Sequence, residues 1–320
     1  MAGLFQRELK KHHGKSGNKI KPINYYNRIM LTLSLIFDSR ERFQMLRKAA
    51  VVTGSGSGIG RAIACQLATD GYNLTLNDLP EQMEALSGGL TETKVLCEKL
   101  GAKCVTFRTD ITDRTAMKEM FQLHTDTFQR LDVTVANAYY AARETFLNQN
   151  FEDIKKTIDV TLLGNYSTCQ LAARTMVDLS KDSEEYQNII IISSVMATFP
   201  YLIDTNAPYN CSKAALNNLS QSMASSLVSN KILVNTVAPG WMDTHGERKF
   251  SPDWKEVEDQ AQAHLPSGLG SAQDIADAVS FLSSNKSNYI NGTTLTVDGG
   301  FGISQRVPGL HDPIIVPESE

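Results

Sequence analysis

From Lys48 onward, short apolar runs alternate with longer segments in which apolar residues recur every three or four positions. The short runs are rich in β-branched residues, a pattern typical of buried strands. The longer segments have the period of amphipathic helices that pack on a core. The predicted strands are Ala49–Thr53, Asn73–Asn77, Lys103–Thr109, Leu131–Asn137, Asn188–Ser193, Ile232–Val237 and Thr294–Val297. The predicted helices are Ile59–Thr69, Thr115–Phe128, Phe151–Leu179, Ala214–Val228 and Ala272–Leu282.

Strands that alternate with helices predict βαβ units, in which a helix joins two parallel strands through a right-handed crossover. The run Ile189–Ile192 is apolar at every position, as expected of a strand that is covered on both faces. We therefore predict an α/β fold with a single Rossmann-type doubly wound parallel sheet of about seven strands and helices on both faces. No internal repeat or low-complexity linker interrupts the pattern, so we expect one domain over residues 47–304.

The two ends of the chain differ from this regular middle. The first 48 residues hold eleven Lys or Arg and three acidic residues, although the whole chain has a net charge of -4. Such a basic segment can be a mitochondrial transit segment, a disordered basic arm, or extra coding sequence ahead of a start at Met30 or Met45. We predict that residues 1–46 form a poorly ordered basic extension without chemistry. Residues 305–320, with three prolines, should form an irregular tail.

The composition, 42% hydrophobic and 21% charged, is ordinary for a globular protein and argues against several classes of function. No run of about 18 apolar residues exists, so we expect no membrane-spanning helix. The small net charge gives no argument for a nucleic-acid or membrane partner. The five cysteines form no C-x-x-C pair, which predicts no metal site and a reducing compartment. We expect a cytoplasmic protein, or a mitochondrial one if the extension is a transit segment.

A glycine-rich turn joins the first predicted strand directly to the first predicted helix. It reads Gly-Ser-Gly-Ser-Gly-Ile-Gly over residues 54–60. Glycines let the backbone approach a pyrophosphate, and a helix N-terminus offers N–H groups and a positive dipole end. We therefore predict a dinucleotide site here. Its cofactor-binding residues are expected to be Gly54, Ser57, Gly58, Ile59 and Gly60.

The second predicted strand ends in an acid, Asp78. A carboxylate there can accept hydrogen bonds from ribose hydroxyls and would repel a 2′-phosphate. The glycine turn also holds serines where an arginine could have neutralised such a phosphate. Both features predict NAD as the cofactor in preference to NADP. The alternative is that Asp78 only forms the turn before Leu79-Pro80.

Tyr209 and Lys213 stand four positions apart at the start of a helical pattern, so their side chains should share one face. An ammonium beside a phenol favours the phenolate and lowers the pKa of the phenol. Such a phenol can exchange a proton with a substrate oxygen while hydride moves to or from a nicotinamide. This spacing also arises by chance, and a surface pair is the alternative. Ser194, at the end of a buried strand, would orient the substrate oxygen, with Ser193 as the alternative.

These motifs follow one another over Lys48–Gly300 and together resemble the short-chain dehydrogenase/reductase family. The matching stretches are Thr53–Gly60 (T-G-x-x-x-G-x-G), Tyr209–Lys213 (Y-x-x-x-K), Asn235–Thr244 (the strand and turn after the catalytic residues) and Val297–Gly300 (the C-terminal signature). The resemblance implies reversible oxidation of an alcohol to a ketone or aldehyde. It assigns Tyr209 as the acid/base, Lys213 as the group that lowers its pKa and binds ribose, and Ser194 as the group that polarises the carbonyl.

The resemblance also implies further contacts to the cofactor. Asp110, after the third strand, would lie near the adenine ring, although a helix N-cap is the alternative role. The other expected contacts are Ile111, Asn137, Tyr209, Lys213, Pro239, Gly240, Met242 and Thr244.

Two positions depart from the family pattern. Tyr139 replaces the glycine of an N-N-A-G turn, where it would be strained if the backbone needs glycine, and its ring could intrude on the nicotinamide side of the pocket. Thr161 replaces an asparagine that helps to hold a proton-relay water, so we expect Thr161 in the catalytic set with a hydroxyl in place of an amide.

These expectations describe an NAD(H)-dependent oxidoreductase that acts on a small polar substrate and forms a homodimer or homotetramer through helices Phe151–Leu179 and Ala214–Val228. Residues 243–270 should form a flap over the substrate, and their polar side chains favour a polyol, sugar or hydroxyketone. The chain resembles family members named glucose 1-dehydrogenase and acetoin or diacetyl reductase. The alternatives are a 3-oxoacyl-carrier-protein reductase with a basic surface at the pocket mouth, or a non-catalytic dinucleotide-binding protein.

Overall fold

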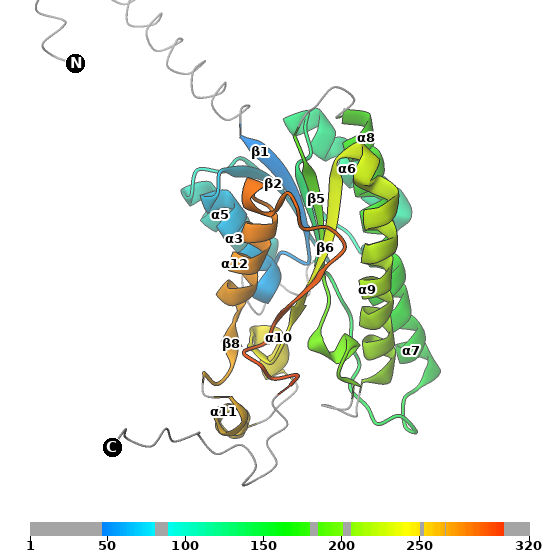
Figure 1. Cartoon of the computed structure of the whole chain (residues 1–320), viewed down its shortest axis with the longest axis vertical. Coiled ribbons are helices and arrows are strands. Elements are labelled where there is room, and N and C mark those ends of the chain that lie inside the picture. Colours follow the sequence, from blue (N-terminus) through cyan, green and yellow to red (C-terminus); the bar gives the residue numbers. More distant parts are fainter. Residues whose placement is uncertain are drawn as a thin grey trace, which may run out of the picture. The chain divides into compact units, whose positions relative to one another are not determined.

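In the computed structural model, a seven-stranded parallel sheet runs through the domain in the order β3-β2-β1-β4-β5-β6-β9 (Figure 1). The structure describes residues 47–80, 89–179, 185–200, 206–249, 253–265 and 267–303, so the expected extension and tail lie outside the described residues. The strands of this sheet are β1 (Lys48–Thr53), β2 (Tyr72–Asp78), β3 (Cys104–Arg108), β4 (Val133–Ala136), β5 (Gln187–Ile192), β6 (Ile232–Pro239) and β9 (Thr294–Val297). The prediction of an α/β, doubly wound parallel sheet is confirmed.

Helices cover both faces of the sheet. One layer contains α3 (Gly58–Thr69), α5 (Gly89–Lys99) and α12 (Ala272–Leu282), and the other contains α6 (Arg114–Phe128), α8 (Asn165–Leu179) and α9 (Ala207–Leu227) (Figure 1). The remaining helices are α7 (Phe151–Ile158), α10 (His245–Arg248) and α11 (Trp254–His264), and a small two-stranded sheet pairs β7 (Met242–Asp243) with β8 (Gly270–Ser271). No helix in the described ranges is long and apolar enough to cross a bilayer.

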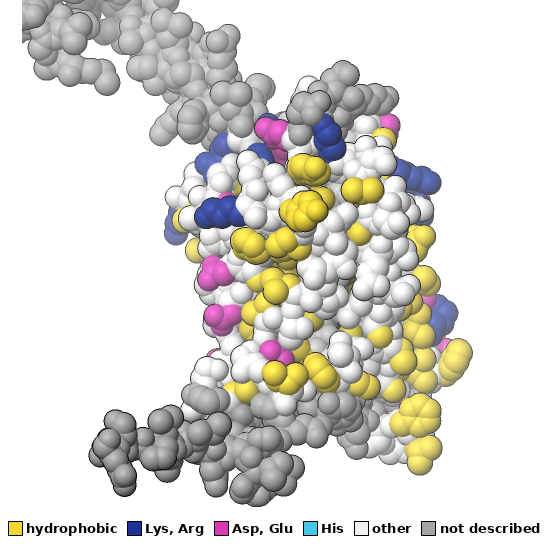
Figure 2. Space-filling model, in the orientation of Figure 1, with side chains coloured by type: hydrophobic (Ala, Val, Ile, Leu, Met, Phe, Trp, Pro, Cys, Tyr) yellow, Lys and Arg dark blue, Asp and Glu magenta, His cyan; other side chains and the backbone are white. Residues whose placement is uncertain are grey.

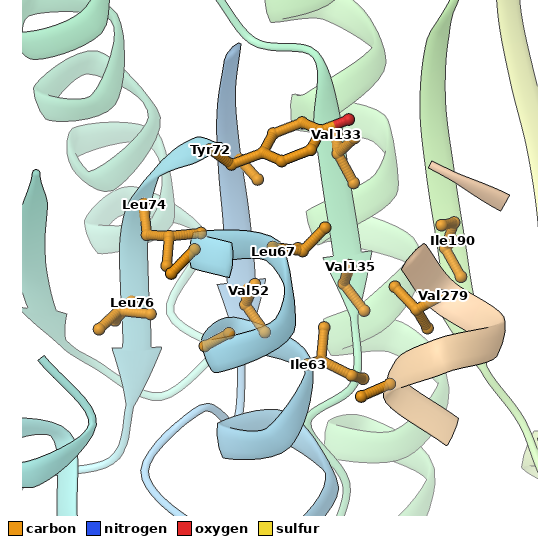
Figure 3. Packing of buried hydrophobic residues seen from close by; sticks show 14 of the residues in the cluster. Val52, Ile63, Leu67, Tyr72, Leu74, Leu76, Val133, Val135, Ile190 and Val279 are labelled. Carbon is orange, nitrogen blue, oxygen red and sulfur yellow. The ribbon is translucent and has the colours of Figure 1, made fainter. Parts of the chain in front are cut away.

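The core consists of two hydrophobic clusters, one on each face of the sheet. Along β5, Ile190 and Ile192 belong to the cluster that includes α3 and α12, whereas Ile189 and Ile191 belong to the cluster that includes α6, α8 and α9. Successive strand residues point to opposite faces, so both sets are buried and the run is apolar throughout. Figure 3 shows the first cluster, with Val52 of β1 near its centre. Each such buried side chain contributes about 1.5–3 kcal/mol.

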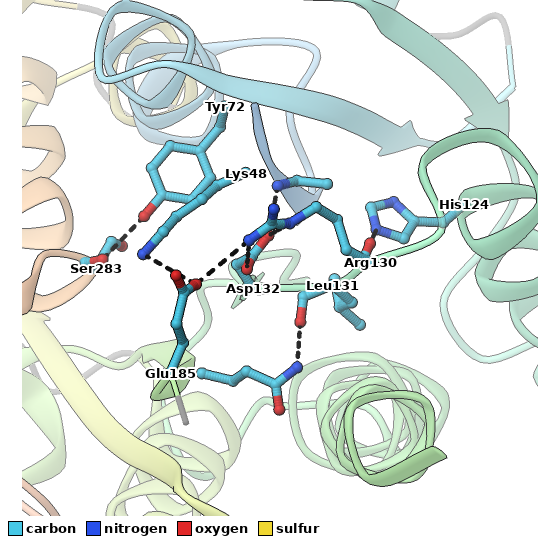
Figure 4. A network of polar contacts seen from close by, with 10 residues as sticks. Lys48, Tyr72, His124, Arg130, Leu131, Asp132, Glu185 and Ser283 are labelled. Carbon is cyan, nitrogen blue, oxygen red and sulfur yellow. Dashed lines mark hydrogen bonds and ion pairs between the residues drawn. The ribbon is translucent and has the colours of Figure 1, made fainter. Parts of the chain in front are cut away.

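A polar network joins the beginnings of the central strands (Figure 4). Asp132, just before β4, accepts a hydrogen bond from the backbone N–H of Ala49 (2.7 Å) and is held by the guanidinium of Arg130 (2.7 Å). Glu185 extends the network to Arg130 (3.4 Å) and to Lys48 (3.9 Å). These residues lie at the opposite ends of the strands from the cleft described below, so the network stabilises the sheet without reaching the site.

The helices differ from the predicted ones in two informative places. The expected single helix Phe151–Leu179 is interrupted by a π-helical turn, Asp159–Gly164, that separates α7 from α8. The apolar pattern continues through this π-helical turn, so the sequence predicted one continuous helix. Helix α9 begins at Ala207, two residues before Tyr209, where the helical pattern was predicted to open. Helix α5 was not predicted because much of its surface is polar and exposed.

Candidate active site

A cleft of about 490 Å³ opens at the carboxyl ends of β1, β2, β4, β5 and β6, the end of the sheet where ligands bind in open α/β folds. In Figure 1 this end lies toward α10. The structure brings all the expected site residues except Thr161 to the walls of this one cleft. They are Gly54, Ser57, Gly58, Ile59, Gly60, Asp78, Asp110, Ile111, Asn137, Ser194, Tyr209, Lys213, Pro239, Gly240, Met242 and Thr244.

The glycine turn has the geometry of a phosphate cradle. Gly54 and Gly58 have positive φ angles (63° and 51°), a conformation that favours glycine. A Cβ added to Gly60 would lie 2.0 Å from the carbonyl oxygen of Gly54, so only glycine lets the helix start so close to the turn. The N-cap of α3, Ser57, makes no capping hydrogen bond with its side chain. The first N–H groups of the helix therefore remain available to an anion such as a pyrophosphate.

Asn137 fixes the turn from the neighbouring strand. Its Nδ2 donates to the carbonyl oxygens of Thr53 (2.9 Å) and Gly54 (3.0 Å), and its backbone N–H donates to the hydroxyl of Thr53 (3.0 Å). These bonds join the end of β4 to the end of β1. The contacts favour a role for Asn137 in positioning the cradle as well as in lining the cleft.

Asp78 connects the end of β2 to the same turn. Its Oδ2 accepts from the backbone N–H of Gly56 (2.7 Å), and its Oδ1 accepts from the N–H of Leu79 (2.8 Å). Burial raises the pKa of Asp78, while these two N–H groups act in the opposite direction. Each carboxylate oxygen keeps acceptor capacity for a further donor, such as a ribose hydroxyl. The contacts therefore fit both readings of Asp78, as a turn residue and as a cofactor ligand.

Asp110 and Ile111 line the cleft at the end of β3. Asp110 Oδ1 accepts from the N–H and the hydroxyl of Thr112, both at 2.8 Å, and so forms a local turn. The N-cap of α6 is Asp113, whose side chain accepts from two N–H groups of the first turn. The alternative reading of Asp110 as the N-cap is therefore wrong.

Tyr209 and Lys213 lie one turn apart at the start of α9, and both face the cleft, as their spacing predicted. Ser194 caps a short 3-10 helix after β5 and also lines the cleft. Ser193 also lines the cleft, but its hydroxyl donates to the carbonyl oxygen of Lys213 (3.2 Å), whereas the hydroxyl of Ser194 accepts from the N–H of Met196 (3.1 Å) and, among the described residues, donates to no backbone carbonyl. Because Ser193 is committed to this backbone contact, the geometry favours Ser194 as the serine that meets a substrate.

The protonation of the pair differs from the expectation. Lys213 is 1% exposed, its Nζ donates to the carbonyl oxygen of Ile192 (2.7 Å), and burial lowers its pKa to about 7. Burial also raises the pKa of Tyr209, with smaller contributions from Tyr139 and Glu247 in the same direction. The net pKa of Tyr209 is therefore raised and not lowered, because burial outweighs the effect that we predicted from Lys213. The phenol is protonated at neutral pH and is a proton donor.

Thr161 is the one predicted site residue that does not line the cleft, and its catalytic role stays a prediction. It is fully buried in the π-helical turn, outside the cleft. Its hydroxyl donates to the carbonyl oxygen of Tyr140 (2.8 Å) and accepts from the N–H of Tyr140 (3.0 Å). Asn165 makes a second hydrogen bond to the same segment by donating to the carbonyl oxygen of Ala138 (2.8 Å). Both side chains hold the chain that leaves β4, so the structure gives Thr161 a positioning role.

Tyr139 is unstrained. Among the described non-glycine residues only Gln129 and Lys231 have positive φ angles, so the expectation of backbone strain at Tyr139 is wrong. Its ring does enter the cleft, where it packs edge-on against the ring of Tyr209 with centroids 5.8 Å apart. The position that glycine occupies in the family pattern therefore carries an aromatic wall beside the phenol.

Other residues of the cleft were not identified as site residues from the sequence. Arg143 and Glu247, 104 positions apart, form an ion pair of 2.6 Å between the chain after β4 and the flap helix α10. Trp241 and Phe301 pack with ring centroids 5.4 Å apart. Only a three-dimensional structure brings such partners together, because no local pattern connects them.

Comparison with known proteins finds one matching family model and several similar enzymes. A family model described as enoyl-(acyl carrier protein) reductase (adh_short_C2) matches residues 54–302. The chain is 30% identical over 265 residues to a diacetyl reductase, (S)-acetoin forming, of Staphylococcus epidermidis, covering 80% of this chain and 98% of that protein. It is 32% identical over 259 residues to a 3-oxoacyl-[acyl-carrier-protein] reductase of Staphylococcus aureus, covering 80% and 98%.

Two solved structures show the same fold with different cofactors. A short chain dehydrogenase from Burkholderia cenocepacia in complex with NADP aligns with a TM-score of 0.69 and 30% identity, covering 81% of this chain and 99% of that chain. A 3-oxoacyl-[acyl-carrier protein] reductase from Brucella melitensis in complex with NAD aligns with a TM-score of 0.72 and 26% identity, also covering 81% and 99%. Relatives thus bind either nicotinamide cofactor.

Proposed function

Because this chain belongs to the short-chain dehydrogenase/reductase family, we propose that it is an NAD(H)-dependent oxidoreductase that interconverts an alcohol and a ketone or aldehyde on a small polar substrate. One observation carries the proposal. The glycine cradle, Asp78, Ser194, Tyr209 and Lys213 all open into a single cleft of about 490 Å³. A protein that only bound a dinucleotide would have no need for a buried lysine and two hydroxyls beside that cleft.

The residues of the cleft divide into a holding set and a reacting set. The glycine turn and the N-terminus of α3 would hold the pyrophosphate, and Asp78 would accept hydrogen bonds from the ribose. When bound, the nicotinamide supplies or accepts the hydride. Both substrate and hydride would thus be brought to the wall formed by Ser194 and Tyr209.

Side chains of the protein carry out the proton transfer. In the reductive direction, the hydroxyl of Ser194 donates a hydrogen bond to the substrate oxygen, and Tyr209 Oη gives that oxygen its proton. In the oxidative direction, the phenolate takes the proton back. Lys213, whose Nζ lies 5.4 Å from the centre of the Tyr209 ring, stabilises the phenolate while it exists.

Asp78 supports NAD as the preferred cofactor, since its carboxylate at the end of β2 would face a 2′-phosphate with like charge. The nearest arginine of the first helix, Arg61, is already committed: it donates to the carbonyl oxygen of Gly56 (2.5 Å) and pairs with Glu92 (2.8 Å). The arginine of this helix therefore does not offset the negative charge of Asp78.

A small polar substrate is supported by the far end of the cleft. There the rings of Tyr139, Tyr140 and Trp241 and the ion pair of Arg143 with Glu247 enclose the space near Tyr209. The diacetyl reductase among the relatives acts, by its name, on a molecule of this kind.

A second candidate is reduction of a 3-oxoacyl group on a carrier protein. The exposed Lys156 and Lys249 line the mouth of the cleft and add positive charge where an acidic carrier would dock. A relative named 3-oxoacyl-[acyl-carrier-protein] reductase gives this reading weight. The ion pair of Arg143 with Glu247, which limits the space near Tyr209, favours the smaller substrate.

We also infer a homodimer or homotetramer. Large apolar side chains are exposed along α7, the π-helical turn and α8, and they include Phe151, Ile158, Leu163 and Tyr166. Figure 2 shows hydrophobic side chains gathered along the edge of the molecule where Figure 1 places α7 and α9. A cytoplasmic location fits the five free cysteines, and the bacterial relatives lend no support to a mitochondrial one.

The test is cofactor oxidation by the purified protein, with NADH and NADPH run in parallel against small diketones, hydroxyketones, sugars and acyl thioesters. Turnover with NADH is expected, and the best substrate separates the two candidate functions. Tyr209→Phe should lower turnover by about 10²–10⁴-fold while NADH still binds, because the variant keeps the ring and loses the proton. Tyr166→Phe, on the exposed side of α8, is the matched control. Full activity in Tyr209→Phe would refute this mechanism.

A further inference from the structure

We propose that Tyr139 is a second substrate-binding phenol, which holds an oxygen on the carbon next to the reacting carbonyl. The preferred substrates are then small α-hydroxyketones or α-diketones, together with the corresponding vicinal diols. The inference rests on the proposed function and specifies its substrate class.

The position of Tyr139 places its ring at the reaction centre. It follows β4, and its ring meets that of Tyr209 edge-on, with centroids 5.8 Å apart and an interplanar angle of 65°. Lys213 Nζ lies 5.6 Å from the centre of one ring and 5.4 Å from the centre of the other. The two phenols therefore flank the same ammonium, and a molecule that reaches Tyr209 also meets Tyr139.

The hydroxyl of Tyr139 is available to a ligand. The side chain is 44% exposed within the cleft, and among the described residues its hydroxyl has no hydrogen-bond partner. The adjacent Tyr140 contrasts with it, because its hydroxyl is committed to Asp153 (3.1 Å). A phenol that both donates and accepts can bind either a hydroxyl or a carbonyl oxygen.

The flap approaches this hydroxyl on one side. A Cβ added to Gly246 of α10 would lie 3.3 Å from Tyr139 Oη, closer than ordinary van der Waals contact. Glycine at this position thus lets α10 approach the phenol without pressing on its hydroxyl, and a ligand reaches the phenol from the cleft. The ring itself fills the side of the cleft next to Tyr209, so a bulky substituent on the carbonyl would meet it. Small flanking groups fit best.

The charges near the two phenols favour a neutral substrate. Arg143 and Glu247 pair at 2.6 Å, and they act on the pKa of Tyr139 and of Tyr209 in opposite directions. Neither side chain is left to bind a substrate carboxylate. The phenol of Tyr139 is then one of the neutral polar groups, with Asn206 and Asn210, that line the cleft and can meet a ligand.

The decisive variant is Tyr139→Phe, which keeps the aromatic wall and removes only the hydroxyl. We would compare kcat/KM for 3-hydroxybutan-2-one and for butan-2-one, which share a carbon skeleton and differ by one hydroxyl. In the unmodified protein the hydroxyketone should be preferred, and in Tyr139→Phe this preference should fall by about tenfold or more. Tyr289→Phe is the matched control, because this phenol is fully exposed and does not line the cleft, and the preference should not change.

An equilibrium measurement gives a second readout. Butane-2,3-diol and butan-2-ol cannot react with a protein that holds reduced cofactor, so calorimetry on that complex reports binding alone. The diol should bind more tightly than the simple alcohol, and Tyr139→Phe should remove about tenfold of this difference.

The outcomes separate the two proposals. If the unmodified protein reduces hydroxyketones and Tyr139→Phe leaves both preferences unchanged, the role of Tyr139 is refuted while the oxidoreductase stands. A protein that favours butan-2-one over the hydroxyketone would refute it equally. If no carbonyl in the panel is reduced and neither alcohol binds, the proposed function itself fails.

Discussion

At the scale of single residues, burial decides how the reacting groups are protonated. Lys213 and Tyr209 both lie away from water, and burial disfavours the charged form of each. The pKa of the lysine therefore falls to about 7, and that of the phenol rises. Spacing in the sequence predicted that these side chains would meet, since four residues make one helical turn. It gave the wrong direction for the phenol pKa, because burial depends on residues from several other elements.

Asp78 supports a prediction at the same scale. Asp78→Ala and Asp78→Asn both remove the negative charge, so each should shift the ratio of NADH to NADPH affinity toward NADPH by at least about tenfold. Fluorescence titration with each cofactor measures the ratio. The alanine variant also loses the acceptor for the Gly56 N–H, so it should bind both cofactors more weakly than the asparagine variant does. An unchanged ratio in both variants would leave Asp78 as a turn residue only.

At the scale of elements, the sequence predicted most accurately the strands that are buried on both faces of the sheet. The parallel strands left continuous apolar runs, such as Ile189–Ile192, and the glycine turn followed the first of them. The break in Phe151–Leu179 was not predictable, because a π-turn preserves the apolar pattern. The same turn directs the hydroxyl of Thr161 to Tyr140, a contact that the sequence did not predict, and a catalytic role for Thr161 stays a prediction.

His124 of α6 connects two elements and predicts how stability depends on pH. It is fully buried, with Nδ1 2.8 Å from Thr75 Oγ1 of β2 and Nε2 2.9 Å from the carbonyl oxygen of Arg130. Burial lowers its pKa from 6.5 to about 4. Between these values the unfolded chain binds more protons than the folded one, so the free energy of unfolding falls as the pH falls. Above pH 6.5 the contribution is fully present.

The expected size follows from the shift. Lowering the pH from 7.5 to 5 should cost about 2 kcal/mol through His124 alone. His124→Gln cannot titrate, so its free energy of unfolding should decline less over the same interval. Urea unfolding at the two pH values measures both slopes, and groups other than His124 contribute equally to each. Identical slopes in the two proteins would mean that folding does not shift the pKa of His124.

At the scale of the whole molecule, the α/β fold with its parallel sheet was predictable, because strands and helices alternate along the chain. The substrate end of the cleft was not, because Arg143 and Glu247 come from distant segments that only the fold brings together. The exposed apolar face of α7 and α8 likewise has no signature of its own. In the sequence its residues have the pattern of an amphipathic helix, and only the structure shows that their apolar side chains are exposed.

That apolar face predicts the assembly state. Light scattering after gel filtration should give two or four times the chain mass of 35.3 kDa. Leu163, 56% exposed on the π-helical turn, would lie within the interface, and Leu163→Glu should shift the protein toward monomer. A symmetric interface contains the substitution twice, and each lost apolar contact costs about 1.5–3 kcal/mol, so the dissociation constant should rise by at least tenfold. Leu100→Glu, at an equally exposed leucine after α5, should leave the mass unchanged. If the unmodified protein is a monomer, or if Leu163→Glu leaves its mass unchanged, this face does not bind a second copy of the chain.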